Sequence, residues 1–95
     1  MSGIVIDDFA MREEVSGHTA DVQDDGTWTV SWLPDVALDR NQAISALMIA
    51  QVLAAGGGLL GGLTVKGRAV VASLAGELGL SELEAAERLA AGGVR

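Results

Sequence analysis

The fold of this chain is decided by the run TWTVSWLP at residues 27–34. Its large apolar side chains alternate with Thr and Ser, which is typical of a β-strand with one buried face: Trp28, Val30 and Trp32. Residues 18–23 supply a first arm, and the turn DDG at 24–26 joins the two arms, because glycine adopts the positive φ that such a turn requires. The sequence therefore predicts a β-hairpin over 18–33, which Pro34 ends because it lacks a backbone N–H.

The residues before the hairpin predict a short strand and a short helix. Ile4–Ile6 is an apolar run that suits a strand or an ordered arm. Asp7 or Asp8 can then cap a helix that continues to about Val15, with the pair at 16–17, Ser-Gly, as its stop.

The residues after the hairpin predict a long apolar helix from Arg40 to about Ala55. Asp39 is a good N-cap for it, because its carboxylate can accept from a free N–H of the first turn. Apolar side chains occupy nearly every side of this helix. We therefore expect it to be buried, or to be shared with a partner.

A glycine-rich turn at 56–62 follows, and a second helix is predicted from about Leu63 to Leu78. Its spacing predicts one buried stripe: Val70, Val71, Leu74 and Leu78.

A last helix is predicted over Glu82–Ala91, with Gly79 in the turn before it and a capping box made by Ser81 and Glu84. Its inward side chains are expected to be Leu83, Ala86 and Leu89. The pair over 74–89 looks like a helix-turn-helix. Its last helix would present three carboxylates and one arginine to phosphates, which opposes DNA binding. A helical corner used for packing is the favoured interpretation, and a helix-turn-helix regulator or antitoxin-like protein is the alternative.

These elements predict an α+β chain in which one N-terminal β-hairpin packs on a mostly helical body of about three to four helices. Its length suits one small domain, 1–95, with an acidic arm and hairpin in 1–39 and a helical part in 40–95 interrupted at 56–62.

The acidic charge lies in the N-terminal part of the chain. Residues 1–39 hold nine acids and one base, and residues 40–95 hold four acids and five bases, so −8 and +1 give the net charge of −7. This composition excludes a simple electrostatic nucleic-acid binder, which needs a basic stripe. The lack of cysteine excludes a disulfide scaffold and a cysteine-based zinc site. With no secretory signal either, a cytoplasmic location is expected.

Catalytic residues are nearly absent from the sequence, which has one His, no Cys and no Tyr. His18 has Glu14 and Asp21 nearby, but a solvated histidine is the favoured interpretation. A calcium loop starting at Asp21 fails, because its twelfth position is Trp32 where a bidentate Glu is required. We therefore expect no enzyme activity, no cofactor and no metal ion.

A membrane segment is a second alternative. Residues 41–65 form a stretch of 25 residues without charge, which is long enough to span a bilayer. Glycines within 56–62 disfavour one continuous helix, so a buried core helix is the favoured interpretation.

The runs 28–34 and 38–44 resemble a pattern in small actinobacterial proteins of unassigned function, which are similar again over 74–86. The resemblance implies an origin in mobile or phage-like regions and carries over no functional residue. Asp35 and Val36 stand where those proteins usually have Gly and Arg. The strand ending at Leu-Pro and the capped helix after it are similar in architecture to HicB-type antitoxins.

Together these features predict a non-enzymatic protein–protein interaction or assembly module that self-associates or docks on a larger complex. The apolar surface exceeds what one minimal core covers readily, and a homo-oligomer or another protein would bury the excess. The residues expected to carry the interaction lie on the second hairpin arm and the central helix: Trp28, Val30, Trp32, Leu47, Met48 and Val52.

Overall fold

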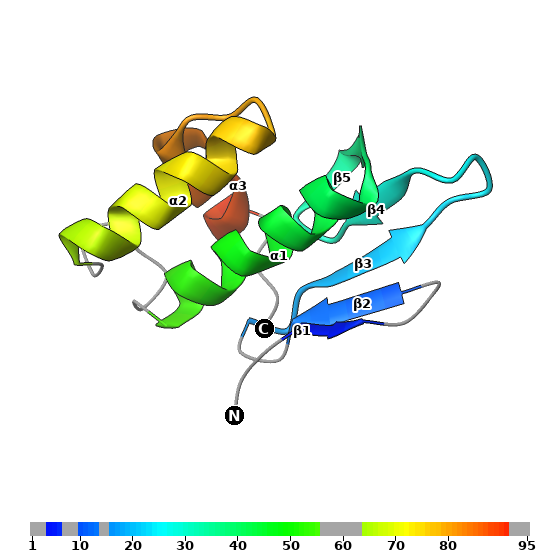
Figure 1. Cartoon of the computed structure of the whole chain (residues 1–95), viewed down its shortest axis with the longest axis horizontal. Coiled ribbons are helices and arrows are strands. Elements are labelled where there is room, and N and C mark those ends of the chain that lie inside the picture. The colour runs from blue at the N-terminus through cyan, green and yellow to red at the C-terminus, as the bar shows by residue number, and fades with distance from the viewer. Residues whose placement is uncertain (1–3, 7–9, 14–15, 56–63, 92–95) are drawn as a thin grey trace.

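The predicted hairpin over 18–33 is matched in part, and it lies inside a larger sheet (Figure 1). The structure is a computed structural model that describes residues 4–6, 10–13, 16–55 and 64–91. Strands β3 (Thr19–Val22) and β4 (Trp28–Val30) pair antiparallel, with Ala20 opposite Val30. Gly26 has a φ of 85° in the turn between them, and Asp25 Oδ1 accepts from the Thr27 backbone N–H at 3.0 Å. These local bonds set the register that brings the apolar side chains of both arms to one face.

Three further strands extend the hairpin into a five-stranded antiparallel sheet of order β1-β2-β3-β4-β5. They are β1 (Ile4–Ile6), β2 (Ala10–Glu13) and β5 (Leu33–Leu38). Each strand therefore pairs with its neighbour along the chain. The α+β class is confirmed, while the single hairpin of the sequence prediction is the centre of a meander.

The helix predicted from Asp7 or Asp8 to Val15 is wrong over residues 10–13, which form β2. Met11 and Glu13 are buried and Arg12 between them is exposed, which is the two-residue period of a strand. Residues 7–9 and 14–15, where that helix would begin and end, lie outside the described residues. Pairing of β2 with β3 decides the conformation here, and a local capping signal does not reveal such pairing.

The predicted strand end at Pro34 is also wrong. The second arm stops at Val30, the chain turns at residues 31–32, and β5 begins at Leu33, so Pro34 is inside a strand. Because β5 is at the edge of the sheet, the missing N–H of proline can be tolerated there. Trp32 lies in this turn, and its side chain is buried. Its indole Nε1–H donates to the Ala46 carbonyl at 3.1 Å.

Helix α1 (Arg40–Ala55) has the predicted bounds. The Gln42 backbone N–H donates to Asp39 Oδ1 at 2.7 Å, which confirms the predicted cap. Gln42 Oε1 accepts in return from the Asp39 N–H at 3.0 Å, so two N–H groups at this helix end are satisfied.

Helix α2 (Val65–Glu77) begins at an N-cap, Thr64, whose hydroxyl accepts from the Gly67 N–H at 3.0 Å. The predicted start near Leu63 lies outside the described residues. Helix α3 (Glu82–Ala91) has its predicted bounds and its predicted capping box, with reciprocal bonds of 3.1 and 3.2 Å between Ser81 and Glu84.

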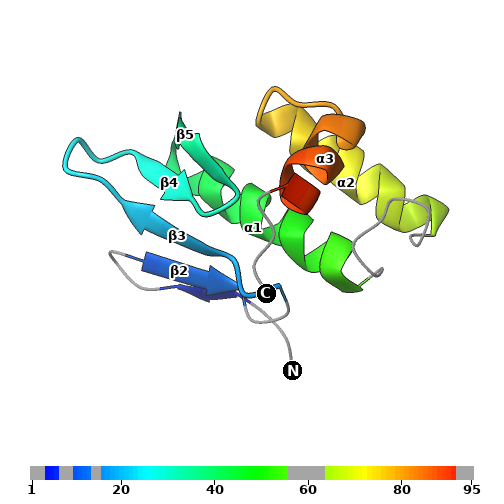
Figure 2. The same ribbon diagram turned by 180° about the vertical axis from the view of Figure 1, so that it is seen from behind.

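Helix α1 lies against one face of the sheet, and α2 and α3 pack on α1, farther from the strands (Figures 1 and 2). α1 contacts all five strands, and α2 packs antiparallel on α1. Gln42 Nε2 donates to the Glu77 carbonyl at 3.1 Å, and Ser45 Oγ donates to Glu77 Oε1 at 3.3 Å. These two hydrogen bonds join the start of α1 to the end of α2. α3 lies against the side of this pair that faces the viewer in Figure 2.

The buried faces of α2 and α3 match the predicted ones in part: four predicted residues are half-buried against the core, namely Leu74, Leu78, Ala86 and Leu89. Val71 is buried, but Val70 is 38 % exposed. On α3 the buried residue is Ala85, and Leu83, predicted to point inward, is 59 % exposed. Both helices lie at the outside of the molecule, where a helix buries one narrow stripe (Figure 2).

We expect Trp32 to be essential for stability, because it joins the sheet to α1. Trp32→Ala should lower the free energy of unfolding by about 3–5 kcal/mol through the cavity it leaves. Trp32→Phe should cost less, about 1–3 kcal/mol, mainly through the lost hydrogen bond to Ala46. Urea unfolding followed by circular dichroism measures both. Val65→Ala is the control, because Val65 is 89 % exposed; a Trp32→Ala variant as stable as this control would contradict the assignment.

Candidate functional site

An apolar stripe runs along the outer side of α1. Ile44, Met48 and Val52 are spaced four residues apart and therefore lie on one side of the helix. Met48 is 38 % exposed, and Ile44 and Val52 are half-buried. The stripe is the part of α1 that neither the sheet nor α2 covers fully.

Helix α2 continues this stripe into a wider surface. The bond between Ser45 and Glu77 sets the antiparallel register of the two helices. One turn along each helix from that bond, Leu74 comes opposite Met48, and one turn further Val70 comes opposite Val52. Val70 is 38 % exposed and Leu74 is half-buried. We call this surface the helical face; its five residues are Ile44, Met48, Val52, Val70 and Leu74.

Helix α3 leaves the helical face free, since it packs on the other side of the α1–α2 pair, as a comparison of Figures 1 and 2 shows. An ion pair of 3.0 Å between Arg68 and Glu82 joins α2 to α3 on that side. A small open hollow of about 320 Å³ lies there, lined by Val65, Arg68, Ala69, Ala72 and Glu82. The two sides of α2 therefore differ: one holds α3, and the other carries Val70.

The residues predicted to carry an interaction divide into two groups. Four of them are at most 4 % exposed and form part of the core: Trp28, Val30, Trp32 and Leu47. Met48 and Val52 reach the surface, on the helical face. Sequence reasoning missed Val70, because its neighbour Val71 belongs to the buried stripe and both were assigned to it.

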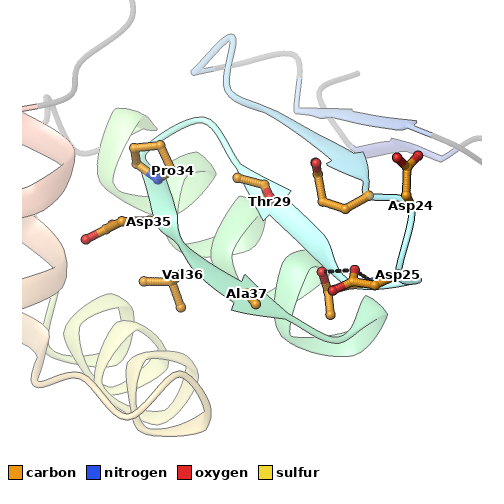
Figure 3. Close-up of a pocket in the computed structure, with 9 residues that line it drawn as sticks. Asp24, Asp25, Thr29, Pro34, Asp35, Val36 and Ala37 are labelled. Atoms are coloured by element: carbon orange, nitrogen blue, oxygen red, sulfur yellow. Dashed lines mark hydrogen bonds between the residues drawn. The ribbon is translucent and has the colours of Figure 1, made fainter.

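A second candidate is an open hollow of about 520 Å³ on the outer side of the β4–β5 hairpin (Figure 3). Its acidic residues are Asp24 and Asp25, in the turn between β3 and β4, and Asp35, in β5. Figure 3 shows the side chains of Asp24 and Asp35 on opposite sides of the hollow and pointing in different directions. Among the described residues, no group of acids, His or Cys is arranged to hold a metal ion. This hollow is a solvated acidic surface.

Asp25 in that hollow has a structural role. Its Oδ1 accepts from the Thr27 hydroxyl at 2.6 Å as well as from the Thr27 N–H. These hydrogen bonds favour the carboxylate and hold the pKa of Asp25 below its ordinary value. Both hydrogen bonds stabilise the turn between β3 and β4.

The single histidine is buried, so the interpretation of His18 as a solvated residue is wrong. Its Nδ1 lies 2.7 Å from Ser31 Oγ, which also accepts from the Thr19 N–H at 3.0 Å. The buried acid near it is Glu13, whose Oε1 accepts from the Ser16 N–H at 2.7 Å. Burial lowers the pKa of His18, and the charge of Glu13 opposes part of that shift. The His18–Ser31 pair thus joins the β2–β3 turn to the turn after β4.

No family model, curated protein or solved structure matches the chain. The resemblance to small actinobacterial proteins and to HicB-type antitoxins therefore stays a prediction. In the part of the chain that the structure describes, no helix has the length and apolar character needed to cross a bilayer. Part of the candidate span within 41–65, residues 56–63, lies outside the described residues.

We expect the stability of the chain to fall as the pH drops below the ordinary pKa of histidine, 6.5. In that range the unfolded chain binds a proton at His18, whereas the folded chain keeps the buried imidazole neutral until the pH reaches its lower pKa. The protein is therefore most stable, with respect to this group, above pH 6.5.

Urea unfolding at about pH 7.5 and about pH 5.5 measures this loss. His18→Gln should unfold more easily at the higher pH, because the bond to Ser31 changes, but should lose less stability between the two pH values. Since the chain has one histidine, the difference between the two proteins isolates this group. Equal losses in both proteins would contradict the burial argument.

Proposed function

We propose that this chain is a non-enzymatic protein–protein interaction module that binds its partner through the helical face. The observation that carries the proposal is the exposure of Met48 on α1 and Val70 on α2, each 38 % exposed, on the same side of the α1–α2 pair. Half-buried Ile44, Val52 and Leu74 surround them. Contiguous apolar side chains of this kind typically mark interaction sites, whereas single exposed apolar residues do not.

The chemistry of the face suits binding. Methionine adapts its shape to a partner surface, and valine loses little side-chain entropy when it is covered. Completing the burial of such side chains contributes up to about 1.5–3 kcal/mol each. Leu47 and Ile49, which flank Met48 in the chain, are fully buried and anchor this part of α1 in the core.

The charge distribution favours the helical side for docking. Five of the described acids lie on the strands and on the β3–β4 turn: Glu13, Asp21, Asp24, Asp25 and Asp35. α1 and α2 carry three bases and one acid: Arg40, Lys66, Arg68 and Glu77. A partner on the helical face therefore does not have to approach the acidic surface, where charges would remain hydrated.

The helix-turn-helix alternative has less support. Gly79 turns the chain with a φ of 76°, and the capping box starts α3, so the corner has the local features of that motif. The carboxylates of Glu84 and Glu87 are exposed on α3, however, and Arg88 is its one base. Such a helix repels a phosphate backbone. We therefore prefer the protein-binding function.

The proposal predicts that one charge introduced on the helical face weakens association strongly. Met48→Asp and Val70→Asp should each weaken self-association or partner binding about tenfold or more, because a buried unpaired carboxylate is strongly unfavourable. Light scattering over a range of concentrations measures mass against the 9.7 kDa of one chain. A pull-down with the immobilised chain tests for other partners.

Leu83→Asp is the matched control, because Leu83 is 59 % exposed on α3, away from the helical face. It should leave association unchanged. The proposal fails if the chain keeps the mass of one copy and if the unmodified chain and Met48→Asp retain the same proteins. It also fails if Leu83→Asp weakens binding while the two variants of the helical face do not.

A further inference from the structure

One side of α2 carries a stripe that begins with a base and ends with an acid. Lys66, Val70, Ser73 and Glu77 follow one another at spacings of four, three and four residues, which places them along one side of the helix. Each of the four has an exposed side chain. The stripe is about 16 Å long, since a helix rises about 1.5 Å per residue.

A stripe of this kind is complementary to its own reversed copy. If a second α2 lies over the first in the opposite direction, Lys66 of each copy meets Glu77 of the other. Val70 of each copy then meets Ser73 of the other. Reversal is what a two-fold axis across the helices produces, and such isologous contacts are the commonest in homo-oligomers.

Helix α1 fits the same axis. It is antiparallel to α2, and its stripe of Ile44, Met48 and Val52 lies beside the α2 stripe on the helical face. A two-fold axis that crosses both helices near their centres places α1 over the second α1, again reversed. Met48 of each copy then meets Val52 of the other, so the apolar part lies at the middle and the charged pairs at the ends. An apolar centre with a polar rim is the usual anatomy of an interface.

We propose that the partner of the helical face is a second copy of this chain, packed face to face about a two-fold axis that crosses α1 and α2. The inference rests on the proposed function, and it adds the identity of the partner and the direction of packing. Its support is the charge complementarity between the two ends of the α2 stripe. The low acidic charge of α1 and α2 also allows two chains of net charge −7 to meet there.

The experiment reverses one charge at a time. In a dimer of Lys66→Glu, each of the two end contacts joins two glutamates, and in a dimer of Glu77→Lys each joins two lysines. Each variant alone should therefore dimerise about tenfold more weakly than the unmodified chain. An equimolar mixture should restore the dimer, because in the mixed dimer both end contacts join a glutamate to a lysine. With one of the two variants labelled with ¹⁵N, native mass spectrometry identifies the mixed dimer by its mass, and sedimentation velocity gives the dissociation constants.

Two controls account for total charge and for folding. Arg12→Glu and Asp21→Lys make the same charge changes at exposed positions on β2 and β3, and should leave the dimer unchanged. Glu77→Lys also removes the bond from Ser45, so thermal unfolding at a concentration where every variant is monomeric checks the fold.

The outcomes separate the inference from the proposed function. Weakened single variants and a restored mixed dimer support the two-fold packing. A dimer that Met48→Asp disrupts but that both charge reversals leave unchanged overturns this packing and leaves the proposed function standing. A chain that is monomeric at every concentration, yet binds another protein through Met48, overturns the second copy as partner. Loss of both the dimer and any Met48-dependent binding overturns the proposed function as well.

Discussion

The hydrogen bond from the Trp32 indole to the Ala46 carbonyl joins the two layers of the molecule, and the rest of the structure depends on it. The donor, Trp32, lies in a turn and not in a strand. Because β4 ends at Val30, the chain can turn here and the indole reaches α1. The turn then sends the chain back as β5, which places Asp39 at the start of α1. One buried polar contact thus orients the strand before it and the helix after it. A buried N–H without such a partner would be unfavourable, which makes the position of the turn specific.

Helix α1 explains why the molecule has a free apolar surface. Its sequence is apolar on nearly all sides, but a single sheet face and a single neighbouring helix can cover only part of its circumference. Ala43, Ala46 and Ala50 are small and buried, which allows the close approach of its neighbours. Met48 is larger and lies on the side that remains. The chain has a third helix, but α3 packs on the opposite side of the α1–α2 pair. The helical face is therefore free because the sheet, α2 and α3 all pack on other sides of α1.

Local signals predicted α1, α3, their caps and the central hairpin, because Asp39, Ser81 and Gly26 act on residues within a few positions. The strands β2 and β5 could not be predicted in this way. The residues of β2 follow two aspartates, which predicts a capped helix as long as the partner strand is unknown. Pro34 is tolerated inside β5 because that strand is at the edge of the sheet. The site was predicted in part for a similar reason. Periodicity shows that α1 is apolar all round, but only the packing tells which of its residues, Leu47 or Met48, remains outside.

The separation of charge from apolar surface connects these features. Several of the described acids lie in caps and turns, where they accept a backbone N–H, as Asp25 and Asp39 do. The buried alanines of α1 and α2, such as Ala46 and Ala75, allow these two helices to pack closely. Among the described residues, α1 and α2 carry a surface that combines exposed apolar side chains, Met48 and Val70, with a single acid, Glu77. A chain of net charge −7 would otherwise repel its own copies through most of its surface, and this surface is where that repulsion is weakest. This distribution of charge is the physical reason for proposing that association occurs through the helices.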